Sequence, residues 1–350
     1  MKDLILKFSK SIKTGVLAML FSLLFGAILI VLSGANPIEA YSALIRGSLG
    51  SPQVLSQTIA KAIPLIFSGL AVAIAHQCKA LNIGGEGQLV VGAFFAALVG
   101  NNIDFLPGVL HIPTLLIVGF LAGSLWAFIP ALLKIKKNVN TVISTIMMNY
   151  VGISLVSFLI SSYFRADNSD FVTMESLPKS SILNFIRIGN FRFTIGIILA
   201  IIIAFILKFI LDKTVLGYEI KAVGSNPIAT NVNGIDSSKN TLIALLVSGG
   251  LAGLVGVFDL VTNLNGKLFD GYNPGYGFDG IPIALLAKGN PVGVIFTALL
   301  FSVLRTGAIT MQTSSGVSST IIDAMQGVII IFIASEYIFS LLKKKKKEVA

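Results

Sequence analysis

Residues 212–240, DKTVLGYEIKAVGSNPIATNVNGIDSSKN, form a long polar island between two strongly apolar runs. Within this island Asn226 and Pro227 are typical of an N-cap followed by a first-turn proline. The pattern predicts a short helix that begins near Asn226 and stops at Gly234. A second short helix is expected before it, with the turn between them at Gly224. Such short helices are marginal in water, so the pair is predicted to be a docking element that packs against something outside the membrane.

The composition around this island predicts a membrane protein. The chain has 350 residues, of which 55% are hydrophobic and only 12% are charged, and its mean hydropathy is +0.89. Several apolar runs reach the roughly 20 residues that a helix needs to cross a bilayer, and helices satisfy their own backbone hydrogen bonds in lipid. The expected fold class is therefore an all-α polytopic membrane protein, with residues 1–350 as a single transmembrane domain.

The distribution of charge predicts how the segments alternate across the membrane. Lysines precede the first apolar run, and five lysines stand at 343–347, so both termini are expected in the cytoplasm. Residues 34–57 are expected to be an interfacial connection, and 164–193 and 264–280 to be extracytoplasmic. The residues 281–305 are split at 288–291 and are expected to form two short helices in a hairpin. With these two helices the expected count is about ten membrane segments, placed at residues 15–33, 58–77, 81–100, 113–133, 141–163, 194–211, 241–263, 281–305 and 320–342.

Several function classes are disfavoured by the residue content. The single cysteine, Cys78, excludes a disulfide within the chain. Its spacing from His76 and His111 does not match a zinc site, which argues against an intramembrane metalloprotease. The net charge of +10 is explained by positive-inside lysines and arginines, so nucleic acid is not an expected partner. No phosphate-binding Gly-x(4)-Gly-Lys-Ser/Thr motif occurs, so any ATP hydrolysis must be done by another subunit.

Two motifs resemble those of one family. The pattern at 217–235, Gly-Tyr-Glu-Ile-Lys-Ala-Val-Gly-x-Asn-Pro-x-Ala-x(4)-Gly-Ile, resembles the coupling loop of ABC-importer permeases of the ribose, branched-chain amino acid and nucleoside type. The stretch Asn-Ile-Gly-Gly-Glu-Gly-Gln at 82–88 resembles the signature of the nucleoside branch. The resemblance implies alternating access and a cytoplasmic ATPase held by the loop. The residues that it assigns to coupling are Gly217, Glu219, Lys221, Gly224, Asn226, Pro227, Ala229 and Gly234.

The resemblance also implies partners and a solute. It implies a paralogous permease in a heterodimer and an extracytoplasmic solute-binding protein or lipoprotein, in addition to the ATPase and the lipid bilayer. No cofactor is expected on this chain, because ATP is used by the partner. Nucleosides are the favoured solute, a simple sugar such as ribose is second, and a branched-chain amino acid is third.

The candidate pathway residues have both a structural and a functional interpretation. Asn82 is expected to cap a helix, and Glu86 lies in its first turns, where the helix dipole favours a carboxylate. The alternative is direct contact with the solute by Asn82, Glu86 or Gln88. Acids in apolar runs usually face a cavity or a partner, and amide and aromatic side chains suit a planar base. These criteria add Asn149, Tyr150, Phe258, Asp323 and Gln326 to the candidate pathway residues, with Asp259 as a further acid near a helix end.

Other function classes remain open from the residues alone. In a proton-coupled secondary transporter, Glu86 and Asp323 would relay protons. The 29-residue polar island argues against that class, because a self-contained carrier has no evident need for a docking helix. An intramembrane hydrolase is third, with only unconvincing Ser/Lys combinations to support it.

Overall fold

The computed structural model describes residues 17, 19–103, 106–167, 169–183, 185–189 and 191–332. These residues fall into two compact units, one formed by residues 59–299 and the other by the described parts of 1–58 and 300–350. Helices α3 and α12 each contribute to both units. The expected single transmembrane domain stays a prediction.

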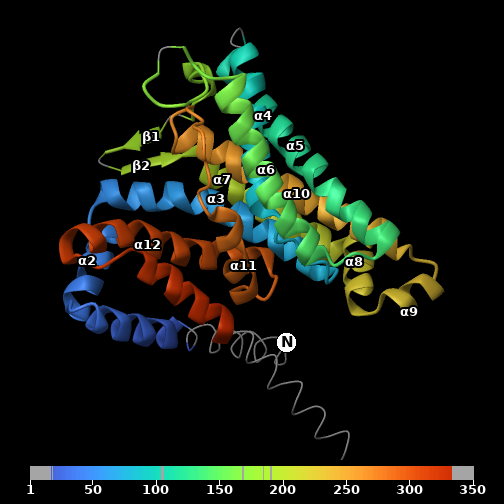
Figure 1. Ribbon diagram of the computed structural model, residues 1–350. Coiled ribbons are helices and arrows are strands. Elements are labelled where there is room, and N and C mark those ends of the chain that lie inside the picture. Colours follow the sequence, from blue (N-terminus) through green and yellow to red (C-terminus); the bar gives the residue numbers. More distant parts are fainter. Residues whose placement is uncertain are drawn as a thin grey trace, which may run out of the picture. The chain divides into compact units, whose positions relative to one another are not determined.

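The described chain is almost entirely helical (Figure 1). The helices are α2 (Pro37–Leu49), α3 (Pro52–Gln77), α4 (Gly85–Asn102), α5 (Gly108–Lys137), α6 (Thr141–Ser162), α7 (Ile195–Lys213), α8 (Val215–Ser225), α9 (Pro227–Val232), α10 (Ser237–Thr262), α11 (Tyr276–Leu286) and α12 (Pro291–Ser315). Two further helices, Met19–Leu32 and Thr320–Phe332, lie near the ends of the described chain.

The core of the 59–299 unit is built by α4, α5 and α10, which pack against one another (Figure 1). Two small-residue motifs, Gly119-x(3)-Gly123 on α5 and Gly249-x(3)-Gly253 on α10, face each other. A Cβ at Gly123 would overlap the Gly249 carbonyl oxygen, and one at Gly253 would overlap that of Gly119. The missing side chains let the two backbones approach closely.

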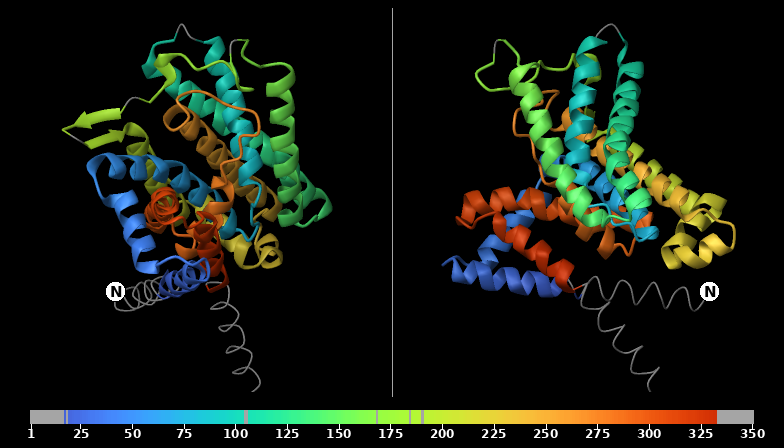
Figure 2. Two further views of the ribbon diagram at one scale, coloured as in Figure 1. Left: turned by 60° about the vertical axis from the view of Figure 1, so that its left-hand side comes forward. Right: turned by 45° about the vertical axis from the view of Figure 1, so that its right-hand side comes forward.

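The loop after α6 and the pair α8 and α9 lie at the two ends of this unit (Figure 2). At one end, the loop after α6 contains a 3₁₀ turn, η1 (Lys179–Ser181), and an antiparallel hairpin of β1 (Phe185–Ile188) and β2 (Phe191–Thr194). The expected all-α class therefore needs a small correction, because the hairpin and an isolated bridge between Thr173 and Phe269 are strand structure. The other end carries α8 and α9.

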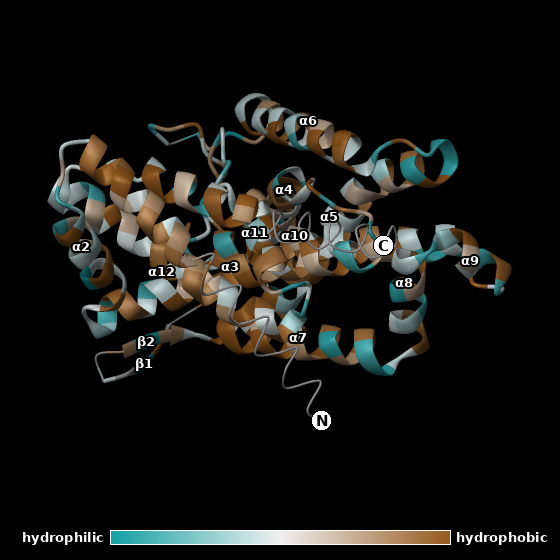
Figure 3. Ribbon diagram, turned by 90° about the horizontal axis from the view of Figure 1, so that it is seen from below, coloured by the Kyte–Doolittle hydropathy of each residue, from teal (hydrophilic) through white to brown (hydrophobic). Residues whose placement is uncertain are grey.

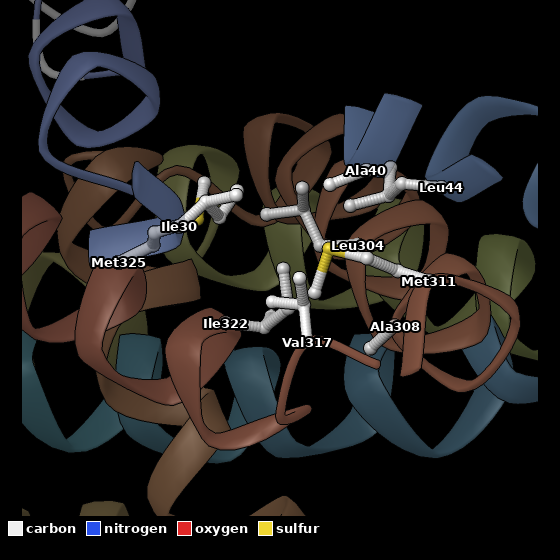
Figure 4. Packing of buried hydrophobic residues seen from close by; sticks show 9 residues of the cluster. All are labelled: Ile30, Ala40, Leu44, Leu304, Ala308, Met311, Val317, Ile322 and Met325. Atoms are coloured by element: carbon white, nitrogen blue, oxygen red, sulfur yellow. The ribbon is translucent and has the colours of Figure 1, made fainter. Parts of the chain in front are cut away.

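The other unit has an apolar core of its own. Its buried cluster joins residues of α2 and α12 with those of Met19–Leu32 and Thr320–Phe332. The nine residues shown in Figure 4 are Ile30, Ala40, Leu44, Leu304, Ala308, Met311, Val317, Ile322 and Met325. Residues 34–57 were expected to be an interfacial connection, but they contain α2 and the start of α3. Asn36 accepts a hydrogen bond from the Ile38 N–H and precedes Pro37, and this cap-and-proline signal starts the helix.

Six described helices are long and apolar enough to cross a bilayer, namely α3, α5, α6, α7, α10 and α12. A seventh crossing arises if Met19–Leu32 and α2, which are bent by 119°, count as one broken span. Helix α4 is not among them, because its glycines and polar residues lower its hydropathy. The expected membrane segment 81–100 is therefore not apolar enough to count as a crossing by this criterion. The predicted total of about ten segments stays a prediction, and the expected termini lie outside the described residues.

The boundaries near α11 and α12 are confirmed only in part. The break expected at 288–291 is present, since α11 ends at Leu286 and α12 begins at Pro291. The Thr297 hydroxyl donates to the Ile283 carbonyl at 3.0 Å, so the two helices pack together after the break. Helix α12 has 25 residues, however, and is not the short helix that was expected.

Candidate functional site

A buried polar cluster surrounds the start of α4. After α3 ends, the chain turns through Lys79, whose φ of 53° is unusual for a residue with a side chain, and it stays non-helical as far as Gly84. In this segment the amide of Asn82 pairs with that of Gln88, with nitrogen to oxygen distances of 2.9 and 3.2 Å. Asn82 also donates to the Ser248 hydroxyl at 2.9 Å. Both amides are buried and mutually satisfied, which holds the segment in one conformation.

The expected cap by Asn82 is wrong in detail. The N-cap of α4 is Gly84, which has no side chain with which to cap the helix. The Asn82 Oδ1 accepts instead from the N–H of Gly84 at 2.9 Å, which fixes the bend that precedes the helix. The glycine pair at 84 and 85 makes the helix start two residues later than the pattern predicts.

Asn149 of α6 closes the same turn. Its Oδ1 accepts from the Gly87 N–H at 2.8 Å, and its Nδ2 donates to the Ile83 carbonyl at 2.8 Å. A Cβ at Gly87 would lie 2.8 Å from the Asn149 Cα, so the two backbones are in close contact. Asn149 therefore connects α6 to the start of α4 through both ends of its amide group.

Glu86 joins α4 to α11. Its side chain is fully buried, and its two carboxylate oxygens accept from the N–H groups of Gly275 and Gly277, each at 2.7 Å. These N–H groups lie at the start of α11, where the positive end of the helix dipole stabilises a carboxylate. A Cβ at Gly277 would overlap the Glu86 backbone, so glycine is needed for this approach. The starts of two short helices are thus held together by one acidic side chain.

A second buried acid lies near the end of α10. Asp259 accepts from the Tyr272 hydroxyl at 2.6 Å and from the Asn263 amide at 2.7 Å. Burial raises the pKa of Tyr272 well above its ordinary value, and the carboxylate of Asp259 adds to this effect. The Tyr272 phenol therefore stays protonated and donates. Tyr272 was missed in the sequence, where it stands in a glycine-rich link without a helical pattern.

The predicted pathway residues come together only in part. Asn82, Glu86, Gln88 and Asn149 are all buried around the start of α4. Tyr150 points away from this cluster, since 69% of its surface is exposed.

The other three candidates are Phe258, Asp323 and Gln326. Phe258 is buried and stacks on Phe67, with a ring-centroid distance of 4.7 Å. Asp323 is exposed and Gln326 is buried on Thr320–Phe332, which belongs to the other unit. Whether any of these residues contacts a solute stays a prediction.

The docking element consists of α8 and α9. Thr214 ends α7 and caps α8, since its hydroxyl accepts from the Gly217 N–H at 3.2 Å. Gly217 fits this sharp corner because a Cβ there would overlap the Ile210 carbonyl oxygen. Asn226 caps α9 by accepting from the N–H groups of Ile228 and Ala229. The predicted helix from Asn226 to Gly234 is confirmed, and Gly234 has the left-handed φ of 80°.

The predicted role of Gly224 in the turn is wrong. Gly224 lies inside α8, and the turn between the helices is at Asn226, whose extended φ and ψ are −157° and 103°. A Cβ at Gly224 would overlap the Gln77 carbonyl oxygen. This glycine is therefore required where α8 crosses the end of α3.

Two predicted coupling residues bond within the chain. Lys221 and Lys208 both pair with the carboxylate of Asp212, each at 2.6 Å, which ties α8 to the end of α7. Glu219 accepts from the Asn240 amide at 3.0 Å and ties α8 to α10. These side chains orient α8 on the unit.

Exposed apolar side chains mark the outer surface of the docking element. Tyr218, Ile228 and Val232 are 66%, 76% and 84% exposed. Tyr218 lies on α8, and Figure 3 shows hydrophilic residues on α8 and on the neighbouring end of α7. The motif residues themselves do not reveal these three side chains, whereas their apolar character in a polar island is a signal that points to a protein contact.

The chain matches one protein family, described as branched-chain amino acid transport system / permease component, over residues 54–334. It is 38% identical to the guanosine ABC transporter permease protein NupP of Bacillus subtilis, over 95% of this chain and 96% of that protein. It is 34% identical to the nucleoside ABC transporter permease protein NupB of Lactococcus lactis, over 97% and 95% of the two chains. It is 30% identical to the glucose ABC transporter permease protein TsgB13 of Haloferax volcanii, over 93% and 88%.

Second permeases from two of these organisms are also similar. The guanosine ABC transporter permease protein NupQ of Bacillus subtilis is 26% identical over 71% of this chain. The nucleoside ABC transporter permease protein NupC of Lactococcus lactis is 23% identical over 73% of it. No solved structure matches the chain.

Proposed function

Because this chain belongs to the permease-component family of branched-chain amino acid transport systems, a multi-pass membrane family, we propose that it forms the translocation pathway of an ABC importer for nucleosides. The observation that carries the choice of solute is the 38% identity to a guanosine permease over 95% of the chain. The 34% identity to a nucleoside permease over 97% of the chain supports it. A sugar is the second candidate, since a glucose permease is 30% identical.

The docking element supports a separate ATPase subunit as the source of energy. Tyr218, Ile228 and Val232 expose apolar surface that suits a protein partner, and Gly217 and Gly224 let α8 pack tightly against α7 and α3. A push on α8 would then be passed to the ends of α3, α7 and α10. A proton-coupled carrier needs no such element, so the alternative of a secondary transporter is less well supported.

The remaining partners follow from the same family. Bacillus subtilis and Lactococcus lactis each have two permeases that resemble this chain, which supports a heterodimer with a paralogous permease. An extracytoplasmic solute-binding protein or lipoprotein would deliver the solute. Both termini would lie in the cytoplasm, and about ten segments would enter the membrane, including broken helices such as α4 and α11.

The test is uptake of labelled guanosine and labelled glucose by vesicles that contain this chain with its partner permease, ATPase and binding protein. Guanosine uptake that requires ATP, and that stops when the ATPase subunit is inactivated, is the expected result. Uptake of glucose in place of guanosine would assign the chain to the second candidate. Uptake that continues without ATP but is abolished by an uncoupler would contradict the importer mechanism.

A further inference from the structure

Two adjoining cavities lie beneath the docking element, with volumes of about 400 and 370 Å³. Both are lined by Lys79, Lys134 and Asn138. The larger one is walled by the end of α8 and the start of α10, including Gly224 and Ser237. The smaller one reaches the start of α6.

The charged side chains that line these cavities are all basic. Lys79 and Lys134 line both of them, and no Asp or Glu is among the residues that line either one. The Lys134 Nζ is held by a 2.9 Å hydrogen bond to the Asn138 Oδ1, which leaves further N–H groups for a ligand. The nearby Asp236 turns its carboxylate to cap α10, where it accepts from the Lys239 N–H at 3.0 Å. Clefts lined by one sign of charge concentrate ions of the opposite sign.

The helices around the cavities add to the positive electrostatic potential of the lysines. Helices α6 and α10, which have 22 and 26 residues, begin at the walls of the cavities with Thr141 and Ser237. The positive end of each helix dipole favours an anion there. Hydroxyl groups of Ser238 and Thr241 add donors that suit phosphate oxygens.

The backbone conformation of Lys79 also supports an anion-binding site. Lys79 has a φ of 53° in the turn that ends α3, where the Ala80 N–H bonds the Ala75 carbonyl. This left-handed position normally favours glycine. A lysine there places a charged side chain at the cavity at a conformational cost.

We propose that these cavities bind the phosphate group of an anionic molecule and thereby hold α8 against the ends of α3 and α5. The volumes leave room for a phosphate that is carried on a larger group. Its source is either the headgroup of an anionic lipid or a soluble phosphate compound. The inference concerns binding alone and does not rest on the transported solute.

The test is thermal unfolding of the full-length chain in nanodiscs, with two arms. In phosphatidylcholine nanodiscs, inorganic phosphate is added at constant ionic strength. In the other arm, phosphatidylglycerol replaces part of the phosphatidylcholine, without phosphate. Ligand that binds the folded state raises the unfolding midpoint, and we expect a rise of roughly 2–4 °C in at least one arm.

A matched pair of double variants tests whether the rise in the unfolding midpoint depends on the cavity lysines. Lys79→Asn with Lys134→Gln removes both cavity charges, since Asn tolerates a positive φ and Gln keeps a donor for Asn138. Lys136→Gln with Lys137→Gln removes two charges from the same end of α5 outside the cavity linings. We expect the rise in the unfolding midpoint to be lost in the first double variant and kept in the second. If the first double variant does not fold, Lys134→Gln alone is compared with Lys136→Gln.

The outcomes separate the two sources. A variant-dependent rise only with phosphatidylglycerol assigns the site to a lipid headgroup, and one only with phosphate assigns it to a soluble compound. An equal rise in both double variants, or no rise of the wild-type midpoint in either arm, would overturn the proposal.

Discussion

The carboxylate of Glu86 illustrates how one side chain fixes a backbone arrangement. Both of its oxygens accept from backbone N–H groups at the start of α11. In Glu86→Gln, the amide nitrogen would face an N–H group, leaving a buried donor without an acceptor. We expect the variant to lower the free energy of unfolding by about 1–3 kcal/mol. Thermal or denaturant unfolding in detergent measures this loss.

The control for this prediction is Glu39→Gln, because Glu39 is an exposed acid in the first turn of α2. Its effect should stay within about 0.5 kcal/mol. If Glu86→Gln keeps wild-type stability but abolishes uptake, the structural interpretation is wrong and the residue acts on the solute.

Gly224 tests the contact between α8 and α3. A Cβ at this position would overlap the backbone carbonyl of Gln77, which has no flexible end that can move aside. We expect Gly224→Ala to destabilise the chain by about 1–3 kcal/mol despite the better helix propensity of alanine. Gly327→Ala is the control, because a Cβ at Gly327 meets nothing within 4 Å. Equal unfolding midpoints of the two variants would contradict the close contact.

Cys78 is predicted to be a slowly reacting thiol. Burial raises the pKa of Cys78 from 9.0 to about 11, which cuts the reactive thiolate at pH 8 about 100-fold. The unfolded chain releases this proton near pH 9, so the stability from the neutral thiol is present below pH 9 and is lost between pH 9 and about 11. Iodoacetamide labelling at pH 8 should be slow until the chain is denatured. Rapid labelling of the folded chain would show that the thiol is accessible.

At the scale of the element, the exposed apolar surface of α9 is predicted to contact the ATPase. Ile228 is 76% exposed, so Ile228→Asp should change the free energy of unfolding by less than about 0.5 kcal/mol. It should nevertheless abolish ATP-driven uptake, because a charge in a buried protein contact is costly. Asn233→Asp adds the same charge at an exposed polar position of this element. Normal uptake by Ile228→Asp would exclude Ile228 from the contact.

The elements also show what the sequence can and cannot predict. Caps are local signals, so Asn226 with Pro227 correctly predicted where α9 begins. Gly224 looked like a turn residue for the same local reason. A glycine is needed there, however, because a Cβ would overlap the backbone of Gln77, which lies about 150 residues earlier in the chain. Similarly, the motif at 82–88 indicated that a helix begins near an acid. It could not show that Glu86 accepts hydrogen bonds from the N–H groups of Gly275 and Gly277, because these glycines belong to a distant segment.

At the scale of the molecule, hydropathy predicted most of the long helices, because α3, α5, α6, α7 and α10 are continuous apolar runs. Helix α4 has a lower hydropathy than these helices, because it is buried in protein and can therefore keep polar residues. Hydropathy missed α2, whose mixed pattern hides a helix that packs on one face only. Burial inside a membrane protein is thus poorly predicted by hydropathy, which reports contact with lipid.

The arrangement of the 59–299 unit makes a prediction about sidedness. Between the loop after α6 and the docking element, α7 is the only described helix that is long enough to cross a bilayer. One crossing places the loop and the docking element on opposite sides of the membrane, and the two lie at opposite ends of this unit (Figure 1). The exposed residues Ser176 and Asn233 report on these two sites.

Each is changed to cysteine in a Cys78→Ala background, and intact cells are treated with a membrane-impermeant maleimide. We expect Ser176→Cys to react in intact cells and Asn233→Cys to react only after permeabilisation, because the docking element must face the ATPase. Reaction of both after permeabilisation shows that each thiol is accessible. Labelling of Asn233→Cys in intact cells would place the docking element outside, where no ATP-driven subunit could reach it.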